Sequence, residues 1–248
     1  SAVWVLWFLT KGTKTELRLR LSNMKLEGKV FGPCLALGAS GFVMLFTEAV
    51  LNISFNSSLS RYGGDLAVGS MTIISSCANL VLLPTSGICQ GCQPITSFNF
   101  GAGNHQRVKK CVFTQIAICG GYATLFWAAC MVAPQMFAGI FTSDPDLIAY
   151  TSWTMRVYMA GIFAMGFQLV CQQSFMALGQ AKVSLLLACL RKIVLLIPLI
   201  FILPAFLENK VFAVFLAEPV SDIVAATVTV TVFMLQFKKI LANGPSKK

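Results

Sequence analysis

Apolar residues fill most of the chain in six long stretches that short polar segments separate. The stretches run from about Val30 to Leu59, Leu66 to Phe98, Cys111 to Phe141, Leu147 to Leu178, Ser184 to Phe206 and Val211 to Phe237. Each exceeds the ~20 residues that a helix needs to cross a bilayer. Because lipid offers the backbone no hydrogen bonds, the pattern predicts an all-α integral membrane protein, a six-helix bundle.

The two ends of the chain differ from these stretches. Residues 1–9 are apolar but too short to cross a bilayer, which indicates the end of a truncated transmembrane helix. We expect residues 10–29 to form a basic cytoplasmic linker, residues 30–237 a six-helix lobe and residues 238–248 a basic cytoplasmic tail. The chain is therefore expected to be a fragment of a longer protein.

Composition excludes several classes of protein. Hydrophobic residues make up 56% and charged residues 11% of the chain, whereas roughly 25% of the residues in a soluble domain are charged. The mean hydropathy of +0.76 agrees with a membrane protein. The net charge of +10 does not indicate a nucleic-acid partner, because the basic residues lie in short runs between apolar stretches.

The basic residues predict an orientation in the membrane. They gather at 11–29, at 107–110, at Lys182 and after residue 237, and the alternate loops hold few of them. The positive-inside rule then places both ends of this segment in the cytoplasm, and we expect a multi-pass protein of the plasma membrane.

Four ionisable residues inside the stretches are candidate functional groups, because a charge in a membrane span is costly. Glu48 lies in the first stretch, Arg156 in the fourth, and Glu218 and Asp222 in the sixth. At 1.5 Å per residue, all four lie roughly 10–18 Å below the predicted outer surface. We predict Glu48, Glu218 and Asp222 as cation-coupling residues, and Arg156 as an ion-pair or gating residue. A purely structural ion pair between Arg156 and an acid of the sixth stretch is the alternative.

Other polar residues and prolines lie in the same stretches. We expect four amides to line a polyspecific cavity, with hydrogen bonding between helices as the alternative: Asn52, Gln93, Gln168 and Gln172. Pro84 and Pro94 predict hinges in the second stretch, or kinks that serve packing. Arg191 and Lys192 lie nearer the cytoplasmic end of the fifth stretch and are expected to snorkel or to face a polar cavity.

Motifs of enzymes and metal sites are not found in the sequence. Cys89 and Cys92 form a CxxC within an apolar stretch, with no second pair, and a single His argues against a Cys/His zinc site. The sequence holds no GxSxG, GxxxxGK[ST] or GxGxxG. We therefore expect no enzyme, no metal site and no cofactor other than a coupling ion, Na⁺ or H⁺.

Several motifs resemble those of the multidrug and toxic compound extrusion (MATE) family. The stretch GCQPITSFNFGAGNHQRVKK at 91–110 is similar to a signature of this family, and MRVYMAGIF, FMALGQAK and LAEPVSDI support it in the expected order. The resemblance covers nearly all of residues 11–240 and is strongest to the bacterial multidrug-resistance branch.

This resemblance implies a fold and a function. Members of the family have twelve spans in two lobes, so the chain would be the C-terminal lobe, and the N-terminal lobe would be a missing partner. The family exports organic, often cationic compounds in exchange for Na⁺ or H⁺. Glu48 resembles a carboxylate of the family's cation site, but the chain has no acid around Phe167 and Gln168, where a second one is expected.

We therefore expect a cation-coupled antiporter that exports small organic cations across the lipid bilayer by alternating access. A flippase for lipids or oligosaccharide-lipids, of related architecture, is one alternative. A non-transporting scaffold subunit is a second, and an intramembrane enzyme is a third.

Overall fold

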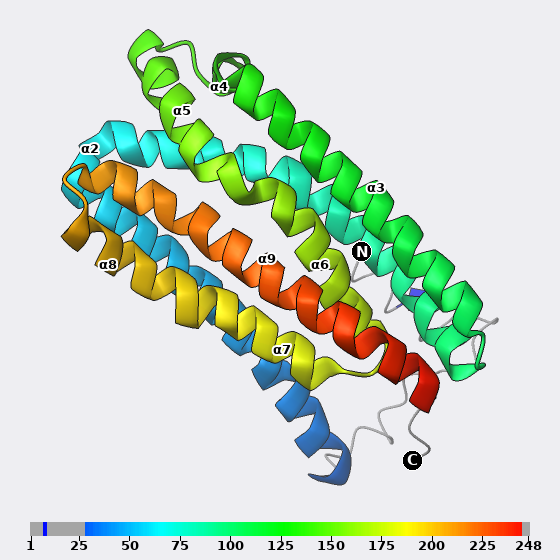
Figure 1. Ribbon diagram of the computed structural model, residues 1–248. Coiled ribbons are helices and arrows are strands. Elements are labelled where there is room, and N and C mark those ends of the chain that lie inside the picture. Colours follow the sequence, from blue (N-terminus) through cyan, green and yellow to red (C-terminus); the bar gives the residue numbers. More distant parts are fainter. Residues whose placement is uncertain (1–6, 9–27, 245–248) are drawn as a thin grey trace. The chain divides into compact units, whose positions relative to one another are not determined.

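The computed structural model in Figure 1 describes residues 7–8 and 28–244 of the chain. The predicted linker at 10–29, the predicted helix end at 1–9 and the end of the predicted tail therefore lie largely or partly outside the described residues. The chain divides into two compact units, Ser1–Glu48 and Ala49–Lys248. The second unit contains helices and no strands within the described residues, and it holds most of the predicted site residues.

Helix α2, Gly28–Gly101, consists of two arms on either side of Gly64. Gly64 has φ 62° and ψ −157°, a left-handed backbone that side chains with a Cβ rarely adopt. A continuous helix of this length would extend about 110 Å, far beyond the bilayer core. In the second unit the arms at 49–63 and 65–101 run in opposite directions (Figure 1), which confirms the predicted break between the first two stretches.

The third predicted stretch is not one helix. Helix α3, His105–Val132, ends at Ala133, and the short helix α4, Pro134–Phe141, begins immediately after it. Pro134 cannot donate a backbone hydrogen bond and clashes with the preceding turn, so it begins a helix rather than continuing one. The stretch predicted from 111 to 141 thus contains two helices, and Pro134 marks the break between them.

The remaining crossings are built from shorter segments. They are α5 (Pro145–Tyr158), the 3₁₀ turn η2 (Met159–Gly161) and α6 (Ile162–Ala177); α7 (Ala181–Cys189), the π-helical turn η3 (Leu190–Leu196) and α8 (Ile197–Phe206); and α9 (Lys210–Asn243). Five described segments are long and apolar enough to cross a membrane. The first of them contains the break at Gly64, so they account for the six predicted crossings.

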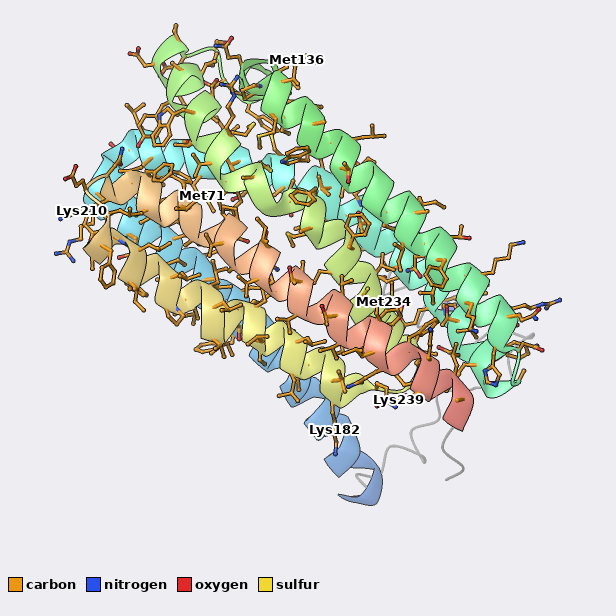
Figure 2. All side chains as sticks on the ribbon, in the orientation of Figure 1. Met71, Met136, Lys182, Lys210, Met234 and Lys239 are labelled. Atoms are coloured by element: carbon orange, nitrogen blue, oxygen red, sulfur yellow. The ribbon has the colours of Figure 1, made fainter. Side chains whose placement is uncertain are left out.

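The ends of the second unit match the predicted alternation of loops. Figure 2 shows Lys182 and Lys239 at one end of the helices and Lys210 at the opposite end. Apolar side chains cover much of the outer surface, among them Leu125 (74% exposed) and Phe206 (82% exposed). Such a surface suits lipid, in which apolar side chains need no burial in protein.

Pro84 lies inside the second arm of α2 without ending it, since Gly64 is the one non-helical residue within α2. Because proline has no N–H, the Leu80 carbonyl one turn earlier loses its helical partner. The Tyr122 hydroxyl of α3 donates a hydrogen bond to this carbonyl at 2.7 Å. A neighbouring helix thus satisfies the group that the proline frees, and the roles of Pro84 and Pro94 as hinges stay predictions.

Candidate functional site

Three charged side chains meet inside the second unit, between η3 and α9. The Arg191 guanidinium donates from Nη2 to Glu218 Oε1 at 2.9 Å and from Nε to Asp222 Oδ1 at 2.6 Å. The side chains are 14%, 10% and 2% exposed for Arg191, Glu218 and Asp222. We call these three residues the charged cluster.

The two helices bring the cluster together because they run antiparallel across a short turn. Asn209 caps α9, its side chain accepting a hydrogen bond from the Phe212 N–H at 3.0 Å. Arg191 precedes Glu208 by 17 residues (208 − 191) and Asp222 follows it by 14 (222 − 208). The two residues therefore differ by three residues in their distance from the turn, which is about 5 Å along the helices. The long arginine side chain spans this offset. Asp222 and Glu218 share one face of α9 because they are four residues apart.

Arg191 belongs to the π-helical turn η3. A π turn inserts an extra residue into a helix and is frequent at functional sites. Pro198, at the start of α8, lacks the N–H that would bond back into this turn. The irregular backbone thus coincides with the residue that holds both carboxylates.

Gly161 lets a third helical segment approach the cluster. A Cβ at Gly161 would lie 2.8 Å from the Cα of Pro219 and 3.1 Å from the Cβ of Asp222. One turn further on, the Met165 sulfur accepts a hydrogen bond from Arg191 Nη2 at 3.6 Å. The motifs MRVYMAGIF and LAEPVSDI, which lie far apart in the sequence, therefore pack against each other at this point.

The cluster has one guanidinium for two carboxylates. All three groups lie where lipid and apolar side chains surround the helices, so each is costly to leave without a partner of opposite charge. Arg191 is the hydrogen-bond partner of Asp222 within the described residues. Any cation that binds to Asp222 must therefore compete with Arg191.

Arg156 does not take the place that the sequence analysis predicted. Its side chain is exposed and forms no ion pair in the described part of the chain. Arg191 is the partner of Glu218 and Asp222 instead. A gating role for Arg156 stays a prediction, and the pairing with Arg191 was missed because the sequence analysis placed Arg191 by its distance from the cytoplasmic end of its own span. Aligning residues across the turn at 207–209 would have matched it with Asp222.

Glu48 is the last residue of the first unit, and its side chain is exposed. Its role in cation coupling stays a prediction. The charged cluster thus contains two of the three predicted coupling residues, together with an arginine that the sequence analysis did not pair with them.

The predicted cavity-lining amides lie in different environments. Gln168 is 3% exposed, and its buried Oε1 has no hydrogen-bond partner in the part of the chain that the structure describes. Gln172 bonds to α7: its Nε2 donates to the Ser184 carbonyl at 3.5 Å, and Ser184 Oγ donates to the Gln172 carbonyl at 3.2 Å. Gln93 is partly buried on α2. Asn52 alone of the four lies in the wall of a described pocket, between the arms of α2.

Aromatic side chains close the interior on the side of the cluster nearer Lys239. Phe175 of α6 meets Phe233 of α9 edge to face, with ring centroids 5.2 Å apart. Phe233 stacks on Phe237 at 4.8 Å. Among the described residues, no group of His, Cys, Asp and Glu is placed to hold a metal ion.

Known proteins resemble this chain in sequence and in structure. The family model described as MatE matches residues 41–202. Multidrug export protein MepA of Staphylococcus aureus (strain MSSA476) is 23% identical over 230 residues, which are 90% of this chain and 49% of that protein. MepA of Staphylococcus saprophyticus is 22% identical over 231 residues, which are 91% and 49%.

Solved structures have the same fold. A MATE crystal structure in the bent conformation matches with a TM-score of 0.82 and 17% identity, over 98% of this chain and 53% of that one. The inward-facing conformation of a multidrug resistance MATE family transporter matches with a TM-score of 0.82 and 16% identity, over 96% and 55%. The chain thus has the fold of a six-helix lobe and spans about half the length of the curated relatives it matches.

Proposed function

The chain belongs to the MatE family, and we propose that it forms the C-terminal lobe of a cation-coupled antiporter that exports organic cations. The proposal places the lobe in the plasma membrane, with both ends of this segment in the cytoplasm and a second lobe as its partner. The relative that matches 90% of this chain is a multidrug export protein, which supports drugs as the exported compounds. The coupling ion is Na⁺ or H⁺.

One observation supports the coupling most directly: a single guanidinium is shared by two carboxylates within a membrane span. A proton or Na⁺ at Asp222 neutralises or screens the charge that Arg191 pairs with. The arginine is then held by Glu218, and the link between η3 and α9 is weakened. Coupling in this scheme is a competition between the cation and Arg191 for the same carboxylate.

The competition gives the lobe two states. With the cation absent, Arg191 ties α9 to the π-helical turn of the neighbouring crossing. With the cation bound, that tie is loosened, and the packing of α9 against Gly161 is free to change. If the drug binds more tightly to one state and the cation to the second, then bound drug lowers the protein's affinity for the cation, and bound cation lowers its affinity for the drug. Exchange requires this reciprocal effect.

The substitution Asp222→Asn in the full-length protein tests this proposal. Asn keeps a carbonyl oxygen for Arg191 Nε but carries no charge and takes up no proton near neutral pH. We expect drug accumulation in inverted vesicles, where export is directed into the vesicle, to lose its dependence on an imposed cation gradient. The control is Asp65→Asn, which makes the same chemical change at an exposed position beside Gly64.

Separate gradients of Na⁺ and H⁺ in these vesicles identify the coupling ion. The proposal is wrong if Asp222→Asn transports drug with the same gradient dependence as the wild type and the Asp65→Asn control. Wild-type drug transport that depends on neither gradient would also contradict the proposal and would favour an uncoupled flippase.

A further inference from the structure

A second polar region lies between the two arms of α2, away from the charged cluster in sequence. It is a hollow of about 260 Å³, which we call the hairpin pocket. Its wall is formed by Asn52, Phe55, Asn56, Met71, Thr72, Ser75, Ser76 and Asn79. All eight residues belong to the second unit, and Met71 is labelled in Figure 2.

The polar residues of the hairpin pocket follow the helical repeat on both arms. Asn52 and Asn56 are four residues apart on the first arm, and Thr72, Ser75 or Ser76, and Asn79 follow at three to four on the second. Asn56 precedes Gly64 by 8 residues and Thr72 follows it by 8 (64 − 56 and 72 − 64). Each arm therefore turns one polar face toward the pocket. Asn56 and Thr72 both lie about 12 Å from Gly64 along their arms.

This face is poorly suited to lipid. The hydroxyls of Thr72 and Ser76 are satisfied within their own helix, donating to the carbonyls of Val68 at 3.1 Å and Thr72 at 2.9 Å. The amides of Asn56 and Asn79 are exposed and make no hydrogen bond within the described residues. Hydrocarbon offers an amide no partner, so these groups require water, a polar ligand or a polar group of the proposed second lobe.

The floor of the hairpin pocket is apolar. Phe55 is 4% exposed and Met71 6% exposed, so both are anchored in the core behind the polar rim. The flexible methionine side chain adapts to varied apolar bodies, and the phenylalanine ring adds a rigid apolar surface. None of the eight lining residues carries a charge, which leaves amides and hydroxyls as the groups that can orient a ligand.

We infer that the hairpin pocket is a substrate subsite that binds the uncharged hydrogen-bonding part of an amphipathic aromatic compound. The aromatic body lies on Phe55 and Met71, and its hydroxyl, carbonyl or amide substituents bond to Asn56 and Asn79. The hairpin pocket has a volume of about 260 Å³, and pockets that hold a whole drug-sized ligand have volumes of ~300 Å³ or more. The pocket therefore holds one part of a larger molecule. The inference rests on the proposed function and adds a neutral recognition element to it.

Binding without transport tests the subsite. The full-length protein in lipid nanodiscs is dialysed against a dihydroxynaphthalene and, separately, against the dimethylnaphthalene of the same substitution pattern. The wild type should prefer the dihydroxy compound, and Asn79→Leu and Asn56→Leu should each lower this preference about 3- to 10-fold, as the loss of one neutral hydrogen bond does. The control is Gln90→Leu, an exposed amide on the same arm outside the pocket, which should leave the preference unchanged.

The outcomes separate the two proposals. Equal preference in the wild type and both asparagine variants overturns the subsite, and so does an equal loss in the Gln90→Leu control. A loss of stability in Asn79→Leu with the preference intact also overturns it, because the amides then pack against protein. Since no cation gradient is present, failure of coupling through Asp222 leaves this result unaffected.

Discussion

The charged cluster and the hairpin pocket are both polar regions of an apolar lobe, but they satisfy their polar groups in opposite ways. In the cluster, the side chains are at most 14% exposed, and Arg191 bonds to both carboxylates. In the pocket, Asn56 and Asn79 are exposed and bond to no described residue. The cluster is a buried ionic network that joins helices, whereas the pocket leaves its hydrogen bonds available to a ligand.

This difference separates stability from recognition. Removing one member of a buried ionic network leaves the others without partners, and the folded state loses free energy. Removing an exposed amide takes away a ligand contact and nothing that the fold depends on. We therefore expect the largest effects on stability in the cluster and almost none in the pocket.

Arg191→Leu should have the largest effect. It leaves Asp222 buried without its hydrogen-bond partner, and breaking a buried ion pair from one side costs about 3–5 kcal/mol of unfolding free energy. Denaturant titration of the full-length protein in mixed micelles measures this loss. Arg156→Leu, at the exposed arginine, should change the unfolding free energy by at most ~0.5 kcal/mol. Similar losses in the two variants would remove the distinction between the cluster and the surface.

Gly161→Val should come second. The added Cβ would lie 2.8 Å from the backbone of Pro219, and overpacking of this kind costs about 1–3 kcal/mol. Because α9 must shift to relieve the clash, the gradient dependence of efflux should fall as well. Gly121→Val is the matched control, since nothing lies within 4 Å of a Cβ there. A Gly161→Val protein as stable as this control would show that the close approach does not matter.

Tyr122→Phe should have a smaller effect that depends on Pro84. The variant loses the hydrogen bond to the Leu80 carbonyl, at a cost of about 1 kcal/mol in unfolding free energy. In a Pro84→Ala background, the new N–H at position 84 can bond to the same carbonyl. The cost of Tyr122→Phe, measured by the same denaturant titration, should therefore shrink in that background. An equal cost in both backgrounds would show that the hydroxyl does not replace the bond that the proline removes.

Asn79→Leu should change stability least, by at most ~0.5 kcal/mol, because the side chain is exposed and bonds to no described residue. Denaturant titration measures this change too, and Gln90→Leu gives the reference value for an exposed amide on this arm. A loss above ~2 kcal/mol, typical of a packed position, would place Asn79 in an interface, and the contrast between the two regions would be lost.

Much of the fold was predictable from the sequence, because apolar length is a strong signal in a membrane protein. The six stretches correspond to the six crossings, and the break at Gly64 falls in the polar segment between the first two. Pro134 was the exception, since a proline within an apolar run marks either a kink or a new helix, and sequence alone does not distinguish them.

The candidate site was less predictable, because it depends on which residues of different helices meet. Glu218 and Asp222 were identified from their cost in a span, but Arg191 was assigned to them only by the structure. The π turn that carries Arg191 has no reliable sequence signal. Asn52 was predicted to line a cavity, whereas Asn56 was missed, although its spacing of four from Asn52 was visible in the sequence.

The central claim is that Asp222 binds the coupling cation in competition with Arg191. The most direct measurement is the number of cations displaced when a drug binds to the full-length protein in weakly buffered micelles, followed with a pH indicator and a Na⁺-selective electrode. By linkage, the wild type and Asp65→Asn should release about one cation per bound drug, and Asp222→Asn should release none. Release from Asp222→Asn equal to that of the wild type would contradict the account.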